Sequence, residues 1–321
     1  MKSVAPSPTL PEGPRPWADD PRAASGKSYD LQRRRFTRMA LAPSLVFLLI
    51  VAGLPTLFLL VTSLTPGALV NPGSLGDFSE PLRNYRLLGG DERFLNSLAV
   101  QARLSLYSVV LQVLLGTGLA LLVHSGQERW KSLRHLFVIP MVLPPIVVAV
   151  IWKLVYTPDI SPVYQAARML GVTLPALTTH VDFALASIVI ADTWEWAPFT
   201  FLMVLAALQN LPAEYVEAAR MDGADALRIF GHIVLPYIAP VLLVCTLFRL
   251  IDSIKAFPLI FLLTGGGPGS VTEVTNYYAY LVAFNFGELG YSSAITVVLL
   301  AATVAISWAA MRLSRNAGGH E

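Results

Sequence analysis

Six long apolar segments constrain the fold of this 321-residue chain more than any other feature of its sequence. A bilayer core about 30 Å thick requires roughly 20 apolar residues in a helix, and each segment is about that long. Because no water reaches the hydrocarbon, the backbone N–H and C=O groups of each segment must pair within it, so helices are expected. The predicted spans are residues 39–64, 98–123, 136–156, 183–208, 234–263 and 292–311.

The composition agrees with a membrane protein. Charged residues make up 14% of the chain, against about 25% in ordinary soluble domains, and the mean hydropathy is +0.59. The net charge of +2 gives no reason to expect nucleic-acid binding, and the single cysteine, Cys245, excludes a disulfide within the chain. The sequence therefore predicts an all-α polytopic membrane protein.

The distribution of Lys and Arg predicts the orientation of the spans. These residues gather in the segment 1–38, the link 124–135, the stretch 209–233 and the C-terminal end, 313–321, with Arg312 just before it. Since cytoplasmic loops carry the excess of positive charge, both termini are expected in the cytoplasm. The proline-rich segment 1–38 is expected to be a disordered tail. The opposite side contains only Arg83, Arg86, Arg93 and Arg168.

The charged stretch 209–233 stands out between two long apolar segments. Its first part, "NLPAEYVEAARMDG", is typical of a short helix with a left-handed glycine cap. Asn210 is expected to cap the helix, Pro212 to lie in its first turn, and a second short helix to begin near Asp225. One interpretation is a surface helix at the lipid headgroups.

The spacing of this stretch resembles the EAA signature of the permeases of bacterial ABC importers. Glu217-Ala218-Ala219 is followed after three residues by Gly223 and, nine residues later, by Ile233-x-Leu235-Pro236. The resemblance implies a membrane subunit of a binding-protein-dependent importer, with its six-helix domain over 39–312 and a coupling helix that docks on a cytoplasmic ATPase. The implied coupling residues are Glu214, Glu217, Ala218, Ala219, Asp222, Gly223, Ile233, Leu235 and Pro236.

A second stretch resembles the carbohydrate-uptake branch of these permeases, which includes the maltose and glycerol-phosphate types. It reads "LTGGGPGSVTEVTNYYAYLVAFNFGELGYSSA", residues 263–294, and "VIPMVLPPIVVAVIWKLVYTP" in the third span fits the same branch. Its aromatic residues can line a sugar pathway or dock a receptor, or they can form an interfacial aromatic belt. These residues are Tyr277, Tyr278, Tyr280, Phe284 and Phe286.

Charged residues within two spans indicate a polar surface inside the protein. Asp192 and Glu195 share one helix face with Trp196 and Phe199, and Arg249, Asp252 and Lys255 are spaced by three. A charge in the bilayer costs roughly 2.5–3.5 kcal/mol, so the acids of the fourth span are expected to pair with Arg249 or Lys255. Such an ion network can hold the helices together without contacting the solute, or it can line the solute route. The candidate pathway residues are Asp192, Glu195, Trp196, Phe199, Arg249, Asp252, Lys255, Asn276, Tyr277 and Tyr280.

The sequence predicts no catalytic, metal or cofactor site of its own. The nearest approach to a phosphate-binding loop is "PRAASGKS", which has Pro21 in place of the first glycine. ATP and Mg are therefore expected on partner ATPase subunits. The resemblance implies two such subunits, a second similar permease and an extracytoplasmic receptor that delivers a sugar-type solute across the bacterial cytoplasmic membrane.

Two rival interpretations belong to other functional classes. In an ion-coupled secondary transporter, the acids Asp192, Glu195 and Asp252 would carry the coupling ion, but no clear inverted repeat is visible in the sequence. A scaffold or regulatory membrane protein is the other. Co-purification of an ATPase subunit and dependence of uptake on ATP distinguish the importer from both.

Overall fold

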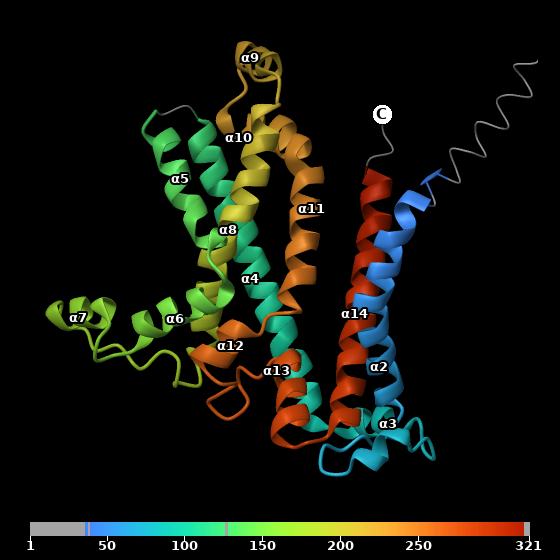
Figure 1. The fold of residues 1–321 in the computed structure, drawn as a ribbon. Coiled ribbons are helices and arrows are strands. Elements are labelled where there is room, and N and C mark those ends of the chain that lie inside the picture. The colour runs from blue at the N-terminus through green and yellow to red at the C-terminus, as the bar shows by residue number, and fades with distance from the viewer. Residues whose placement is uncertain (1–35, 38, 126–127, 318–321) are drawn as a thin grey trace, which may run out of the picture. The chain divides into compact units, whose positions relative to one another are not determined.

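The computed structural model describes residues 36–37, 39–125 and 128–317. Nearly all of the predicted tail 1–38, and the last four residues of the chain, lie outside these ranges. Within them the regular secondary structure is helical, as predicted, and β pairing is confined to isolated bridges at Ala68 (Figure 1). The chain divides into two compact units, one ending at Phe58 and one beginning at Leu59, and each is described by itself.

The described part of the first unit is one apolar helix. It begins at Met39, includes the π-helix η1 (Leu49–Gly53), and continues as α2 (Leu54–Ser63) into the second unit. Only 6% of its most apolar window is buried by the chain itself. Exposed apolar side chains around a helix of this length are expected where lipid or another protein covers it.

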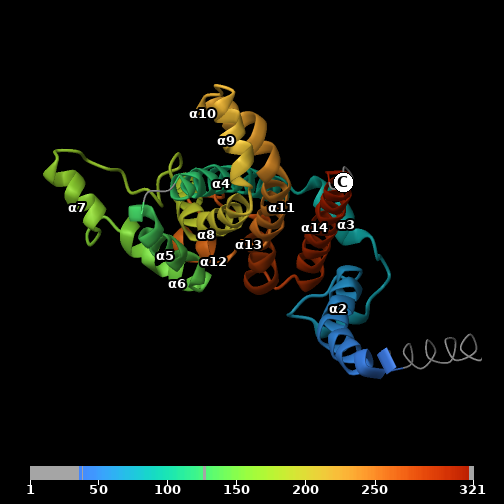
Figure 2. The same cartoon turned by 90° about the horizontal axis from the view of Figure 1, so that it is seen from above.

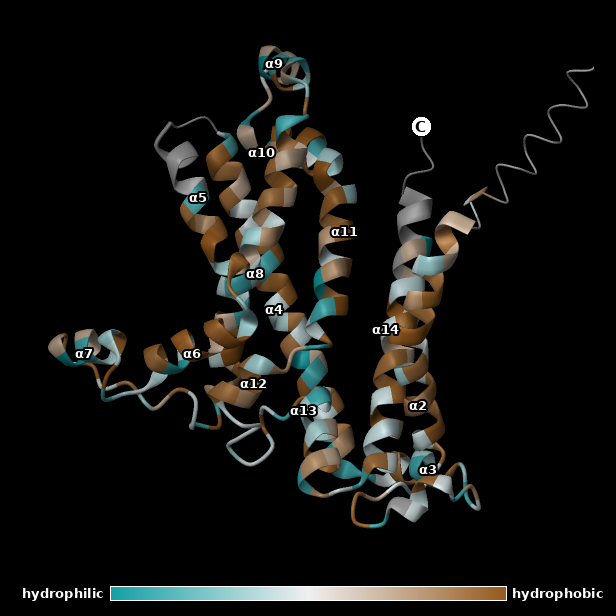
Figure 3. Ribbon diagram, viewed as in Figure 1, coloured by the Kyte–Doolittle hydropathy of each residue, from teal (hydrophilic) through white to brown (hydrophobic). Residues whose placement is uncertain are grey.

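Five helices in the described ranges are long and apolar enough to cross a membrane, and hydrophobic residues run along them in Figure 3. Four of the predicted spans, 39–64, 98–123, 183–208 and 292–311, match these helices closely, although α4 begins earlier than predicted. The last span continues as helix to Ala317, past the predicted end of the membrane domain. The five helices are Met39–Ser63, α4 (Glu92–His124), α8 (Ala184–Gln209), Ala226–Ser253, and Leu289–Ala309 within α14 (Leu289–Ala317).

The third predicted span, 136–156, is wrong as a single straight helix. It consists of the end of α5 (Glu128–Val142) and of α6 (Pro145–Tyr156), which are bent by 106° against each other. Pro144 is extended, and Pro145 opens α6. A residue before proline avoids the helical region, so two consecutive prolines force the break.

The fifth predicted span, 234–263, is also wrong in its bounds. The helix begins at Ala226 and ends at Ser253, through α10 (Ala226–Ile229), η3 (Phe230–Val234) and α11 (Leu235–Ser253). The second cytoplasmic helix predicted from Asp225 is thus the first turn of this span. A separate helix, α12 (Pro258–Leu263), follows because the chain leaves helical geometry before Pro258.

Helices α4, α8 and α11 pack against one another and form the core of the second unit (Figure 2). Helices α4 and α8 approach closely at Gly116 of α4. A Cβ atom there would meet the Cβ of Thr200 at 2.6 Å and the carbonyl oxygen of Ala197 at 2.8 Å. Small residues permit such contact between membrane helices, so glycine at this position sets the spacing between α4 and α8.

A polar cluster joins the start of α4 to α13 (Thr275–Tyr280) and α14. The Arg93 guanidinium donates two hydrogen bonds of 2.7 Å to Glu273, and the hydroxyls of Tyr278 and Tyr291 donate to Asp91. Partial burial would raise the pKa of Asp91, but these bonds and two from backbone N–H groups outweigh it and hold the pKa below its usual value. The cluster fixes the end of the second unit opposite α9 (Ala213–Met221) (Figure 1).

Two glycines on the same helix test the close contact. Gly116→Ala is expected to destabilise the purified protein by about 1–3 kcal/mol, because the added methyl meets backbone atoms of α8. Gly118→Ala is the matched control, since nothing lies within 4 Å of its added Cβ. Thermal unfolding in detergent should show a lower midpoint for the first variant only. Equal midpoints would contradict the assigned contact.

Candidate functional site

The stretch predicted to be a coupling helix forms α9, which projects beyond the ends of α8 and α11 (Figure 1). The prediction that Asn210 caps it is wrong, because Asn210 ends α8 and Pro212 holds the N-cap position. Pro212 has no N–H to satisfy and so can precede a helix without cost. Glu214 lies in the first turn, where its charge complements the helix dipole.

The predicted left-handed cap at Gly223 is confirmed. Its φ is +81°. The Gly223 N–H donates to the carbonyl oxygen of Arg220 at 3.0 Å, and the Ala224 N–H donates to the carbonyl oxygen of Ala219 at 2.9 Å. This pair of bonds is the Schellman arrangement, which ends a helix and turns the chain sharply. The turn returns the chain directly to Asp225, whose carboxylate accepts from the N–H of Arg228 and starts the fifth span.

The predicted coupling residues lie mostly at the surface of this hairpin. Glu214, Glu217, Ala218 and Asp222 are exposed, Ala219 and Ile233 are half-buried, and Leu235 and Pro236 lie exposed at the start of α11. The hairpin also presents three large, exposed apolar or aromatic side chains beside these residues. They are Tyr215, Met221 and Leu227, which are 60%, 89% and 80% exposed.

A side-chain bond closes the base of the hairpin. The hydroxyl of Tyr237, in the first turn of α11, donates to the carbonyl of Asn210 at 2.9 Å. It therefore links the end of α8 to the start of α11 and fixes the two points from which α9 projects.

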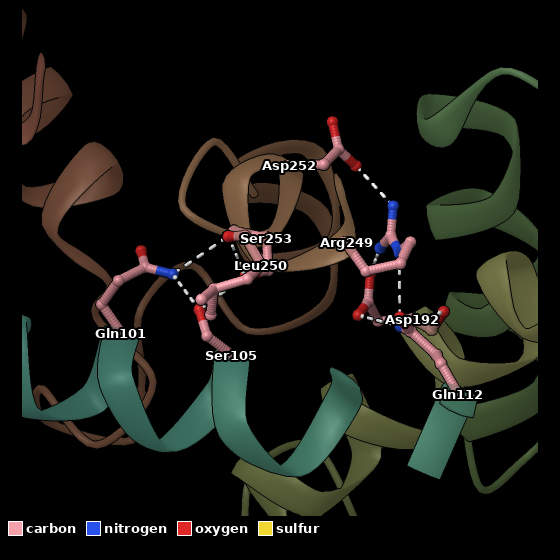
Figure 4. Close-up of polar contacts among 8 residues, drawn as sticks. All are labelled: Gln101, Ser105, Gln112, Asp192, Arg249, Leu250, Asp252 and Ser253. Carbon is pink, nitrogen blue, oxygen red and sulfur yellow. Dashed lines mark hydrogen bonds and ion pairs between the residues drawn. The ribbon is translucent and has the colours of Figure 1, made fainter. Parts of the chain in front are cut away.

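The predicted ion pairing between the fourth and fifth spans is confirmed for one acid. The Arg249 guanidinium on α11 lies 3.8 Å from a carboxylate oxygen of Asp192 on α8, and it donates to Asp252 at 2.6 Å (Figure 4). Asp192 and Arg249 are both buried. A buried pair of this kind needs further hydrogen bonds to offset the loss of water.

Gln112 of α4 supplies those bonds. Its carbonyl oxygen accepts from Nε of Arg249 at 2.9 Å, and its amide nitrogen donates to the carboxylate of Asp192 at 2.8 Å (Figure 4). The same nitrogen donates to the backbone carbonyl of Asp192. Gln112 thus joins three spans at one point. The sequence analysis missed it, although an amide within an apolar span is itself a signal of a buried polar contact.

The remaining predicted residues of the two spans have different surroundings. Trp196 lies under the Arg249 guanidinium, 4.2 Å from ring centroid to Cζ, in a cation–π contact. Phe199 is half-buried one turn further along α8. Lys255 is exposed and forms no ion pair within the described ranges, so the pairing considered for it is not found.

Glu195 is the exception among the acids. It is 1% exposed, and neither of its carboxylate oxygens has a hydrogen-bond partner in the part of the chain that the structure describes. The terminal nitrogen of Arg249 that approaches Asp192 also lacks a hydrogen bond there. We call the cluster of Gln112, Asp192, Glu195, Trp196, Arg249 and Asp252 the central cluster. Within the described residues, two acceptor oxygens of Glu195 and one donor nitrogen of Arg249 in this cluster have no hydrogen-bond partner.

A second polar layer joins α11 to α4, one turn further along α11 and two to three turns nearer the start of α4. The Gln101 amide donates to the backbone carbonyl of Ser253 at 3.0 Å, and the hydroxyls of Ser253 and Ser105 are 2.8 Å apart (Figure 4). All three residues are buried. These bonds fix the end of α11 just before the chain breaks toward α12.

The predicted aromatic group divides into two sets. Tyr277 stacks with Tyr280, and Phe257 and Phe261 complete this set, with ring centroids 5.3–6.3 Å apart. Phe284 packs on Tyr280. By contrast, Tyr278 and Phe286 lie against Arg93 in the opposite polar cluster. The Asn276 amide donates to the backbone carbonyl of Lys255, which places the first set beside the end of α11.

Comparison with known proteins adds independent findings. Residues 112–317 match the family described as "Binding-protein-dependent transport system inner membrane component". The chain is 35% identical to "Probable ABC transporter permease protein y4oQ" of Sinorhizobium fredii, over 86% of this chain and 91% of the relative. It is 34% identical to "Trehalose/maltose transport system permease protein MalF" of Thermococcus litoralis, over 73% and 79%.

The fold has a solved counterpart as well. A chain in the crystal structure of a bacterial alginate ABC transporter, in complex with an alginate pentasaccharide-bound periplasmic protein, superposes with a TM-score of 0.77. The superposition covers 90% of this chain and 96% of the other, at 20% sequence identity.

Removing one member of the buried ion pair should be costly. Arg249→Gln is expected to destabilise the protein by about 3–5 kcal/mol, because it leaves Asp192 buried and without a cation. Adding Asp192→Asn should recover part of this loss. Lys255→Gln is the matched control and should stay within about 0.5 kcal/mol of the native protein. Thermal unfolding of the four proteins provides the measurement. A double variant no more stable than Arg249→Gln would contradict the pairing.

Proposed function

The chain belongs to the family of binding-protein-dependent transport system inner membrane components, and we propose that it is the permease subunit of an ATP-binding-cassette importer for a carbohydrate. The observation that carries this proposal is the exposed, sharply turned hairpin of α9, whose EAA signature lies within the matched residues 112–317. The trehalose/maltose relative supports the carbohydrate class. The proposed solute is an oligosaccharide, a sugar alcohol or a related molecule.

The hairpin is proposed to dock on an ATPase subunit. Its polar residues Glu214, Glu217 and Asp222 and its apolar Tyr215 and Met221 are all exposed, so charged and apolar contacts are both available to a partner. The short side chains of Ala218 and Ala219 allow a partner to approach the backbone of α9 closely. ATP and Mg belong to the partner, and this chain contributes the receiving surface. The orientation that places α9 in the cytoplasm follows from the Lys and Arg distribution.

The complete importer is proposed to contain a second, similar permease, two ATPase subunits and an extracytoplasmic receptor. In this arrangement the bent pair α5–α6 counts as a sixth span, and the solute route lies between the two permeases. Closure of the ATPase pair would draw the two hairpins together. Because α9 is joined to the fifth span through the cap at Gly223, that motion reaches the central cluster.

The solute route is proposed to pass the central cluster and the aromatic set around Tyr277 and Tyr280. The cluster combines unsatisfied polar groups with the ring of Trp196, and the aromatic set adds further ring faces next to Lys255 and Asn276. Sugars present hydroxyls and apolar ring faces, which such a surface can bind.

The docking role of the hairpin is testable at its cap. Gly223→Val forces a β-branched residue into a left-handed conformation that costs about 1–2 kcal/mol, which corresponds to roughly a tenfold loss of ATPase docking. Glu217→Lys, which reverses an exposed charge, should weaken docking in the same assay. Co-purification of the ATPase subunit with the inserted permease measures both effects.

The matched control is Gly231→Ala, because Gly231 lies in the following helix and has open space around an added Cβ. This variant should retain ATPase binding and transport. Full binding by the Gly223→Val and Glu217→Lys proteins would contradict the proposed docking.

The energy source separates the importer from an ion-coupled secondary transporter. Proteoliposomes that contain the assembled complex should accumulate the solute when ATP is supplied to the ATPase side and the receptor is present outside. Collapse of the proton and sodium gradients with ionophores should leave the uptake rate unchanged. Uptake that follows an imposed ion gradient without ATP would establish the rival function.

A further inference from the structure

Two cavities adjoin along the spanning helices of the second unit. The first, of about 660 Å³, lies between α4, α5, α6 and α8, and the second, of about 640 Å³, lies between α4 and the start of α8. Leu111 of α4 and Ile190 of α8 line both cavities. The two cavities therefore meet at these residues, and we call them together the α4–α8 groove.

The groove follows the membrane-spanning part of the two helices. Its lining extends from Leu106 to Leu119 on α4, and from Asp182, just before α8, to Pro198. At 1.5 Å per residue these stretches are about 20 Å and about 24 Å long. Half of a bilayer core is about 15 Å thick, so the groove is long enough to hold a lipid chain along its length.

The surface of the groove is almost entirely apolar. Leu115, Leu136 and Ile139 line it and are more than half exposed, so the groove is open at the surface of the chain. Thr193 and Trp152 also line it, but the hydroxyl oxygen of Thr193 and the ring nitrogen of Trp152 are buried. A cavity without polar partners does not hold water, so an apolar ligand is expected to fill it.

The groove lies on the face of α8 opposite the central cluster. Because a helix turns by about 100° per residue, Ile190, Trp194 and Ala197 share one side of α8, and Asp192 and Glu195 lie on the other. The proposed solute route passes the central cluster, between the two permeases. On that proposal the groove faces away from the second permease and toward lipid.

One charged side chain lines the groove, at the end opposite α9. Asp182 lines the second cavity, and its side chain is 78% exposed. The His180 ring lies 3.7 Å from its carboxylate, and no Lys or Arg lines either cavity in the described part of the chain. A carboxylate at this position attracts a cationic headgroup and repels an anionic one.

We infer that the α4–α8 groove binds an acyl chain of a phospholipid whose headgroup carries an ammonium group, with that group next to Asp182. The chain lies between α4 and α8 and ends against α5 and the edge-to-face pair of Trp152 and Trp194, whose ring centroids are 5.9 Å apart. This lipid site goes beyond the proposed import function, which it uses only to decide which face of α8 meets lipid.

Photolabelling of the assembled permease–ATPase complex in lipid nanodiscs tests the site. The probe is phosphatidylethanolamine with a diazirine near the end of one acyl chain, and mass spectrometry identifies the labelled peptides. Label is expected on residues 111–119 and 136–140, which line the first cavity. It should saturate at a low fraction of probe, whereas label from bulk lipid rises in proportion to that fraction.

Variants that fill the groove should remove this label. Ile190→Trp enlarges a side chain where the two cavities meet, and the cost of overpacking, about 1–3 kcal/mol, corresponds to at least roughly a fivefold loss of saturable label. Ala186→Trp fills the second cavity and serves as an independent variant if Ile190→Trp does not fold. Leu300→Trp, at an exposed residue of α14 outside the groove, is the matched control and should label like the native complex.

Competition by unlabelled lipids tests the role of Asp182. Phosphatidylethanolamine should displace the probe roughly twofold to fivefold better than phosphatidylglycerol with the same chains, as expected for an exposed ion pair. Asp182→Asn should bring this ratio close to one. Asp159→Asn, at an exposed carboxylate that does not line the groove, should leave it unchanged. Measurement at pH 8 keeps protonation of the nearby His180 low.

Three results would overturn the inference. Absence of saturable label from residues 111–119 and 136–140, with or without label on the second permease, would mean that protein covers the groove. Equal label in the native, Ile190→Trp and Ala186→Trp complexes would place the lipid elsewhere. Equal displacement by the two lipids would remove the role of Asp182. Photolabelling requires neither ATP nor solute, so failure of ATP-driven uptake would count against the proposed function and not against this site.

Discussion

The second unit depends on the close approach of α4 and α8 at Gly116. Without a side chain at this position the two backbones come near enough for Gln112, one turn away on α4, to reach both the carboxylate and the backbone carbonyl of Asp192. That position lets the other end of the Gln112 amide hold Arg249 of α11. The glycine contact therefore makes the polar junction of the three spans possible. A wider spacing between α4 and α8 would leave the charges of this junction unpaired in an apolar surrounding.

Much of the architecture is readable from the sequence because the bilayer limits the choices. The lengths of the apolar segments predict the long helices, and the turn at Gly223 follows from the spacing of one signature and the conformational freedom of glycine. The facing of Asp192 and Arg249 follows from equal depth in neighbouring spans. In each case a local rule and the membrane require the same result, so no knowledge of the tertiary packing is needed.

Tertiary packing decides what the sequence analysis missed. The bend between α5 and α6 and the end of α11 before Pro258 had proline signals, but hydropathy alone cannot separate a straight span from a broken one. Glu195 lies on the same helix face as Asp192, yet only the three-dimensional structure shows that, among the described residues, Asp192 is paired and Glu195 is not. Gln112 carries no charge, so the charged positions within the spans do not reveal the residue that connects them.

The uninterrupted helix from Ala226 to Ser253 has a mechanical consequence. At 1.5 Å per residue, about 35 Å of helix separates its start at Ala226 from Arg249, so a rotation about that start is amplified at Arg249. A tilt of about 5° at the base would displace the guanidinium by about 3 Å on this geometry. Since Arg249 lies 3.8 Å from Asp192, such a small rotation is enough to separate or to close that contact.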